Sequence, residues 1–121
     1  MRTRVLVADD QAPFRLAARA VVQATADFEL VAEARSGEEA ILLVERLRPE
    51  LVLMDIRMAG IGGIEAARRI ALRRPATVTI LVSTLCECDL PPEAGTCGAA
   101  GYARKSDFGP AMLRRVYRSA R

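Results

Sequence analysis

The chain has 121 residues with a formal net charge of +3, and 51% of its residues are hydrophobic while only 4% are aromatic. This length suits one domain with a buried core, and the composition excludes a disordered chain. No apolar run has the length of a signal peptide or of a membrane span, so we expect a cytoplasmic domain without membrane contact.

Arginine supplies almost all of the positive charge, since Lys105 is the only lysine. The arginine pairs at 68–69, 73–74 and 114–115 fall at helical spacing, and no basic stripe with interleaved aromatic residues is present. We therefore interpret these arginines as solvated helix faces rather than as a nucleic-acid surface.

Short apolar runs alternate with amphipathic runs along the chain. This alternation predicts one α/β domain with a five-stranded parallel sheet and helices on both faces. A capping-box pattern at Ser36 and Glu39 opens one helix, and Pro49 ends it. In chain order, the predicted elements are strand Arg4–Ala8, helix Ala12–Ala24, strand Phe28–Ala34, helix Gly37–Arg48, strand Leu51–Met54, helix Gly63–Arg74, strand Thr77–Val82, strand Gly101–Arg104 and a last helix from Pro110.

The segment 86–98 lies where a fourth helix would complete this alternation. Pro91, Pro92 and Gly95 all disfavour a helix beyond its first turn. We predict that this helix is short, beginning near Pro91, or that the segment is partly irregular.

Polar side chains follow four of the five predicted strands. Because the carboxyl ends of parallel strands meet along one edge of a sheet, these side chains should share one crevice. Clustered carboxylates repel one another, and a hard divalent cation such as Mg²⁺ relieves that repulsion. An ammonium and a hydroxyl group opposite them could hold an anion, which equips a carboxylate to be phosphorylated. The residues concerned are Asp9, Asp10, Asp55, Ser83 with Thr84, and Lys105.

Four stretches, VLVADDQ, LVLMDIRMAGIGGIEAARRI, ILVST and GAAGYARKSDF, resemble blocks of the receiver domain of two-component response regulators. They occur in the same order and at compatible spacings. The Gly-Tyr-x-x-Lys-Ser block and the GIEAARRI helix are most similar to the NarL/FixJ subfamily, which has LuxR-type output domains. The resemblance implies a flavodoxin-like receiver fold with strand order 2-1-3-4-5.

The resemblance also implies roles for the clustered residues. Asp55 would be phosphorylated by a sensor histidine kinase. Asp10 would bind Mg²⁺ directly, Asp9 would contribute through water, and the backbone carbonyl of Arg57 would supply a further oxygen.

Three other residues would recognise the phosphoryl group and transmit the signal. Lys105 would pair with this group and Ser83 would hydrogen-bond to it. Tyr102 would move inward as Ser83 is drawn toward the phosphate, and this movement would reshape an output surface.

Several positions depart from the family pattern. Ala59 replaces a usual proline, which gives the loop after Asp55 more conformational freedom. Ser106 replaces the proline that often follows this lysine, so Lys105 would be placed by a trans or strained peptide bond. The bulky Arg57 lies two residues beyond Asp55, where family members influence water access, and we hypothesise that it slows autodephosphorylation.

The three cysteines, Cys86, Cys88 and Cys97, all lie in or beside the irregular segment. The chain has no histidine, and the cysteine spacing matches no zinc motif. We expect reduced thiols that are buried or incidental, rather than a metal-binding or redox-sensing group.

We interpret residues 1–121 as a receiver domain that controls transcription through a helix-turn-helix domain absent from this chain. DNA would be contacted only through that absent domain, and a homodimer is possible. We expect no enzyme activity beyond assistance to its own phosphotransfer and dephosphorylation. The alternatives are a phosphorylation-independent dimerisation module and an aspartate-nucleophile phosphatase, although such phosphatases usually have a second acid where this chain has Arg57.

Overall fold

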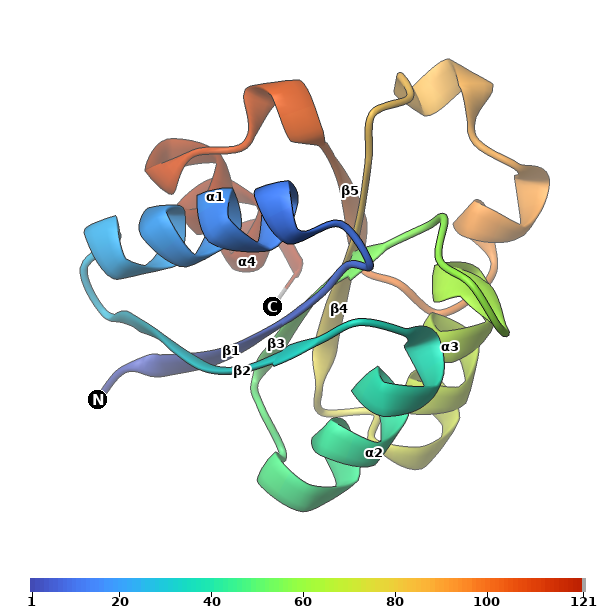
Figure 1. Ribbon diagram of the computed structural model, residues 1–121, viewed down its shortest axis with the longest axis horizontal. Helices are drawn as coiled ribbons and strands as arrows, with labels where there is room; N and C mark the ends of the chain where they lie inside the picture. The colour runs from blue at the N-terminus through green and yellow to red at the C-terminus, as the bar shows by residue number, and fades with distance from the viewer. Residues whose placement is uncertain (121) are drawn as a thin grey trace.

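A computed structural model describes residues 1–120 of the chain. Five parallel strands form the centre of the molecule (Figure 1). Their order in the sheet is β2-β1-β3-β4-β5, as the family resemblance predicts. Each predicted strand is present, with ends that differ by at most one residue. The strands are β1 (Thr3–Ala8), β2 (Phe28–Ala34), β3 (Leu51–Asp55), β4 (Val78–Ser83) and β5 (Gly101–Arg104).

Helices cover both faces of this sheet, with α1 and α4 on one face and α2 and α3 on the other (Figure 1). The Ser36 hydroxyl accepts a hydrogen bond from the Glu39 amide at 3.1 Å, which confirms the predicted start of α2. Arg48 has left-handed backbone geometry, so α2 ends one residue earlier than predicted. The helices are α1 (Ala12–Ala24), α2 (Gly37–Leu47), α3 (Gly62–Arg73) and α4 (Pro110–Ala120).

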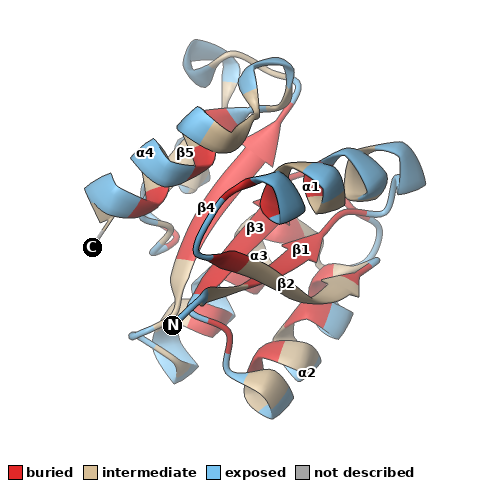
Figure 2. Cartoon of the chain, turned by 90° about the vertical axis from the view of Figure 1, so that its left-hand side faces the viewer, coloured by how far each residue is buried: buried red, intermediate tan, exposed pale blue. Residues whose placement is uncertain are grey.

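The side chains of β3 pack into a hydrophobic core on each face of the sheet. Val52 and Met54 face the core beneath α2 and α3, while Leu51 and Leu53 face the core beneath α1 and α4. All five residues of β3 are buried, which explains why its sequence is continuously apolar up to Asp55. Figure 2 shows the largely buried strands β1, β3 and β4 between helices whose outer surfaces are exposed.

The segment between β4 and β5 contains no α-helix. Two short 3₁₀ turns, Glu87–Asp89 and Pro92–Gly95, take its place. The prediction of a partly irregular segment is therefore confirmed, because the prolines remove the backbone donors that a continuous helix requires. Leu90, Ala94 and Cys97 still pack onto the core beneath α2 and α3, so the segment covers this end of the sheet.

None of the helices among residues 1–120 combines the length and the apolarity that crossing a bilayer requires.

The start of α3 lies directly against the end of β3. The Gly63 amide donates a hydrogen bond to the Ile56 carbonyl at 3.0 Å. A Cβ atom at Gly63 would lie 1.8 Å from the carbonyl oxygen of Asp55, closer than any non-bonded contact allows. Glycine is therefore required at this position, because only hydrogen fits between α3 and the strand.

We predict that Gly63→Ala lowers the free energy of unfolding by about 3 kcal/mol, because the new methyl group must displace backbone rather than a flexible side chain. Gly95→Ala is a matched control, since a Cβ atom there meets nothing within 4 Å. Its effect should stay within about 0.5 kcal/mol. Urea unfolding followed by circular dichroism measures both, and equal stabilities for the two variants would contradict the packing argument.

Candidate functional site

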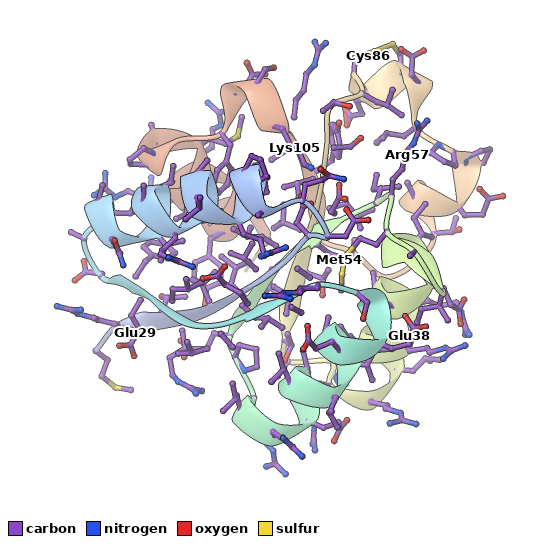
Figure 3. The ribbon with its side chains drawn as sticks, in the orientation of Figure 1. Glu29, Glu38, Met54, Arg57, Cys86 and Lys105 are labelled. Atoms are coloured by element: carbon purple, nitrogen blue, oxygen red, sulfur yellow. A yellow bond between two sulfur atoms is a disulfide. The ribbon has the colours of Figure 1, made fainter. Side chains whose placement is uncertain are left out.

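The polar residues at the carboxyl ends of the strands converge as predicted. Asp9 directly follows β1, Asp55 and Ser83 end β3 and β4, and Lys105 directly follows β5. Asp9, Asp55 and Ser83 are 0%, 5% and 3% exposed, respectively. Figure 3 shows Lys105 at this end of the sheet, with Arg57 on the loop that follows β3.

The Lys105 ammonium group joins the two buried carboxylates. Its Nζ atom lies 2.6 Å from Asp9 Oδ2 and 3.2 Å from Asp55 Oδ1. It also lies 4.6 Å from the centre of the Phe14 ring, close enough for a cation–π interaction. Phe14 was not among the predicted site residues, and nothing in the sequence indicated this contact.

The carboxylates and the ammonium group shift one another's pKa values. Burial raises the pKa of Asp55 from 3.8 to about 6; the charge of Asp9 adds to this effect and Lys105 opposes it. For Lys105, burial disfavours the charged form, but the close ion pair with Asp9 and the charge of Asp55 outweigh it. The pKa of Lys105 therefore lies above its ordinary value, and the ammonium group stays charged at neutral pH.

Three carboxylates offer a cation a compact set of oxygen ligands. Oxygen atoms of Asp9, Asp10 and Asp55 all lie within 4.8 Å of one another. Asp9 Oδ1 accepts a hydrogen bond from the Gln11 amide at 2.8 Å, whereas the buried Asp9 Oδ2 has an ion pair but no aligned hydrogen bond. Asp10 is exposed, so one side of the cluster is open to water. These residues fit Mg²⁺, which prefers oxygen ligands and retains several waters.

A pocket of about 190 Å³ opens beside these groups. Asp55, Ser83 and Lys105 contribute to its wall, and Asp10 and Arg57 line it as well. Arg57 is exposed, and it lines the same pocket as Asp55. The pocket places a carboxylate, a hydroxyl and an ammonium group around one small space, which suits an anion as small as a phosphoryl group.

Ser83 and Tyr102 are connected through the backbone of Leu85. Ser83 Oγ accepts a hydrogen bond from the Leu85 amide at 3.2 Å. The Tyr102 hydroxyl donates to the Leu85 carbonyl and lies 3.3 Å from the Ser83 carbonyl. Burial raises the pKa of Tyr102, so its hydroxyl remains a donor. Tyr102 does not line the pocket beside Asp55, and the role of Leu85 in binding it was not predicted.

The peptide bonds of the described residues are all trans, including the one between Lys105 and Ser106. Lys105 begins a 3₁₀ turn, Lys105–Asp107, and its side chain reaches Asp9 and Asp55. Of the two predicted alternatives, a trans or a strained bond, the trans bond is present.

The expectation of three reduced cysteines is wrong. Cys97 is free and buried, as expected, but Cys86 and Cys88 form a disulfide. The turn after β4 brings their Cα atoms to 5.5 Å, within the ordinary range for a disulfide. Sequence spacing alone does not show such a turn, which is why the pairing was missed.

Comparisons with known proteins agree with this arrangement. A family model described as "Response regulator receiver domain" matches residues 5–117. The response regulator GacA of Pseudomonas protegens is 40% identical over 103 residues, which make up 84% of this chain and 48% of GacA. Protein-glutamate methylesterase/protein-glutamine glutaminase 4 of Myxococcus xanthus is 42% identical over 100 residues, or 83% of this chain and 28% of that protein.

Solved structures show the same fold. The signal receiver domain of NarL from Mycobacterium tuberculosis superposes with a TM-score of 0.89 at 28% identity, covering 98% of this chain and 96% of that one. The match covers nearly the whole NarL receiver chain but only about half the length of GacA.

We predict that Asp55→Asn stabilises the metal-free protein above pH 6. The folded-state pKa of about 6 exceeds the ordinary value of 3.8, so ionised Asp55 costs stability above pH 6 and costs none below about pH 4. The variant should gain about 1–3 kcal/mol at pH 7.5, and the gain should shrink as the pH falls toward 4. Urea unfolding in EDTA measures this difference. A gain that persists unchanged at pH 4 would refute the assignment, and Asp10→Asn at the exposed carboxylate is the control.

Proposed function

Because the chain belongs to the response regulator receiver family, we propose that Asp55 accepts a phosphoryl group from a sensor histidine kinase. The N–P bond of the kinase phosphohistidine breaks as a bond forms between phosphorus and an Asp55 oxygen. The observation that carries this proposal is the placement of the buried Asp55 carboxylate, with Lys105 Nζ at 3.2 Å and the pocket beside it. With a pKa of about 6, Asp55 is largely ionised at pH 7.5 and can act as the nucleophile.

Asp10, Asp55 and the Arg57 carbonyl would hold Mg²⁺, with Asp9 contributing through water. When bound, the ion supplies positive charge that offsets both the carboxylates and the phosphoryl oxygens. The compact carboxylate set and the incompletely satisfied Asp9 Oδ2 support this assignment.

Lys105 and Ser83 would contact the phosphoryl group on the side opposite the proposed Mg²⁺ ligands. Lys105 already lies between Asp9 and Asp55, so a small displacement of Nζ lets it donate to a phosphoryl oxygen on Asp55. Ser83 Oγ currently accepts from the Leu85 amide, and its own hydroxyl proton can be donated to the phosphoryl group.

Movement of Ser83 would carry the signal to Tyr102. Both residues bind the backbone of Leu85, so a shift of Ser83 changes the acceptors of the Tyr102 hydroxyl. Tyr102 would then occupy a different position against the 86–98 segment. The proposed output surface consists of this segment, β5 and α4.

In the whole protein, we propose that this cytoplasmic receiver controls transcription through a helix-turn-helix domain outside the chain. The similarity to GacA, which is named a response regulator, supports this assignment. Homodimerisation through the output surface would couple phosphorylation to DNA binding. The chain itself would not act as an enzyme on external substrates. The Myxococcus relative is named for an enzyme activity, but the region that it shares with this chain makes up only 28% of that protein.

A second candidate is a phosphorylation-independent interaction module. The observation that favours it is the absence of an α-helix between β4 and β5, which alters the proposed output surface. A phosphatase is disfavoured because Arg57 replaces the second acid that such enzymes use.

We predict that incubation with acetyl phosphate and Mg²⁺ adds one phosphoryl group to the wild-type chain and none to Asp55→Ala. Intact-mass spectrometry measures the adduct. Asp10→Asn should reduce the yield at least tenfold if its carboxylate holds the metal. No adduct on the wild type would favour the interaction module, while rapid turnover of phosphate esters without a stable adduct would favour the phosphatase.

We also predict that Arg57→Asn shortens the lifetime of the Asp55 phosphoryl group several-fold. Arg57 is exposed and lines the pocket, so truncation of its long side chain should give water a freer approach to phosphorus. Decay of the adduct mass after removal of acetyl phosphate gives the lifetime. Arg57→Lys, which keeps a long side chain, is the matched control, and an unchanged or longer lifetime for Arg57→Asn would refute the hypothesis.

A further inference from the structure

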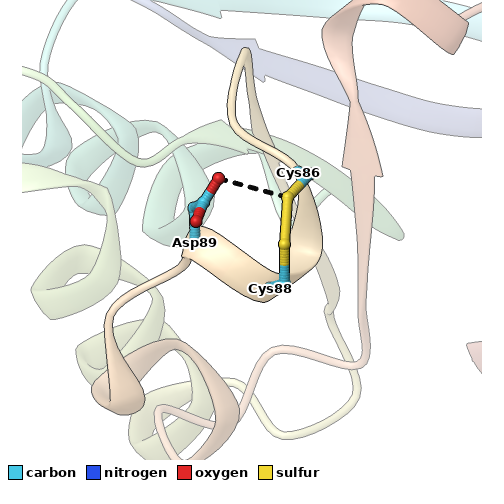
Figure 4. Close-up of side chains that lie close together, drawn as sticks. All are labelled: Cys86, Cys88 and Asp89. Atoms are coloured by element: carbon cyan, nitrogen blue, oxygen red, sulfur yellow. Dashed lines mark hydrogen bonds between the residues drawn. A yellow bond between two sulfur atoms is a disulfide. The ribbon is translucent and has the colours of Figure 1, made fainter.

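The sequence Cys86-Glu87-Cys88-Asp89 forms a largely exposed turn that begins three residues after Ser83. Figure 4 shows the disulfide between Cys86 and Cys88 on this turn, with Asp89 beside it. Cys86 is partly exposed and Cys88 is exposed, so reagents in solution can reach the sulfur atoms. Access of this kind separates reactive disulfides from buried structural ones.

We propose that Cys86 and Cys88 form a reversible dithiol–disulfide site that couples the ambient redox state to the backbone contacts of Ser83 and Tyr102. In the oxidising direction, two S–H bonds break and one S–S bond forms. The two electrons and two protons pass to a low-molecular-weight disulfide, which becomes two thiols. A small dithiol reverses the reaction by thiol–disulfide exchange.

The fold tolerates both states of this site. The disulfide closes a loop with a single intervening residue, and so short a loop restricts the unfolded chain much less than a long one does. Neither cysteine belongs to the hydrophobic cores, whereas the third cysteine, Cys97, is buried in one of them. Reduction therefore removes a local constraint and leaves the sheet and both layers of helices intact.

The surroundings of Cys86 suit the reduced state as well as the oxidised one. Cys86 Sγ lies 3.2 Å from Asp89 Oδ2, the contact drawn in Figure 4. A hydrogen bond there requires a proton on sulfur, which the disulfide lacks and the thiol supplies. Reduction therefore gains a hydrogen bond with little movement of Cys86, while Cys88 is released.

The turn is directly connected to Ser83 and Tyr102 through Leu85. Leu85, which precedes Cys86, donates its amide hydrogen to Ser83 Oγ and accepts from the Tyr102 hydroxyl through its carbonyl. On the other side, the Asp89 amide donates to the Cys86 carbonyl at 3.0 Å. A change in the backbone of Cys86 therefore acts on Leu85 through one peptide unit.

A pocket of about 290 Å³ gives the turn room to rearrange. Glu87, the residue enclosed by the disulfide, lines this pocket together with Leu90 and Tyr102. Release of the disulfide frees Glu87 to change position beside the Tyr102 ring. The pocket therefore links the redox site to the same tyrosine that binds Leu85.

A metal site fits these residues less well. Cys86, Cys88 and Asp89 can bring three ligand atoms within 4.8 Å, but the described residues supply no fourth ligand for a closed tetrahedral zinc site. The bond between the two sulfur atoms also uses the thiolates that a metal would need.

The first experiment counts thiols in the whole chain across a series of reduced and oxidised dithiothreitol ratios. Each sample is quenched with acid and alkylated in denaturant, and its intact mass is then measured. We expect three alkylated thiols at the most reducing ratio and one at the most oxidising ratio. The change should reverse fully when reductant is restored. Cys86→Ser and Cys88→Ser are matched controls and should keep two alkylated thiols throughout.

The second experiment tests the coupling without phosphorylation, so it stands even if Asp55 proves not to be the phosphoacceptor. We expect reduction to increase hydrogen exchange at the Leu85 amide several-fold and to shift the Tyr102 ring resonances, with the Val7 amide in β1 unchanged. The double variant Cys86→Ser/Cys88→Ser should match the reduced protein under both conditions. A constant thiol count, a disulfide that links two chains, or a redox effect that does not reach Leu85 and Tyr102 would each overturn the proposal.

Discussion

The ion pairs of Lys105 with Asp9 and Asp55 are the interaction on which the functional edge of the sheet depends. Two buried carboxylates at the ends of adjacent strands would repel each other in a poorly solvated space. The ammonium group, 2.6 Å from one and 3.2 Å from the other, offsets this repulsion and is itself held over the Phe14 ring. Strand β5 and helix α1 are thereby connected to the centre of the site.

The same edge shows a conflict between stability and function. The backbone at Asp55 is held tightly, because Gly63 brings α3 into contact with the Asp55 carbonyl. The side chain, however, is placed where its ionised form is unfavourable, as its pKa of about 6 shows. A rigid backbone therefore holds a carboxylate whose ionised form gains from a nearby positive charge.

Local sequence patterns predicted most of the fold. The apolar run before Asp55 identified a strand buried on both faces, and the capping pattern at Ser36 located the start of α2. Parallel topology then predicted that Asp9, Asp55, Ser83 and Lys105 would meet. What could not be predicted depends on geometry within turns: the disulfide follows from how residues 86–88 bend, and the Phe14–Lys105 contact follows from how the 3₁₀ turn after β5 returns over α1.

The two 3₁₀ turns between β4 and β5 have a consequence for how this surface can diverge among related proteins. In an α-helix, each inserted or deleted residue rotates all later side chains by roughly 100°, so its recognition face tolerates few changes in length. The turns Glu87–Asp89 and Pro92–Gly95 impose no such periodicity. Length changes here alter the local contour alone, so this surface can vary while the sheet and its acidic edge stay the same.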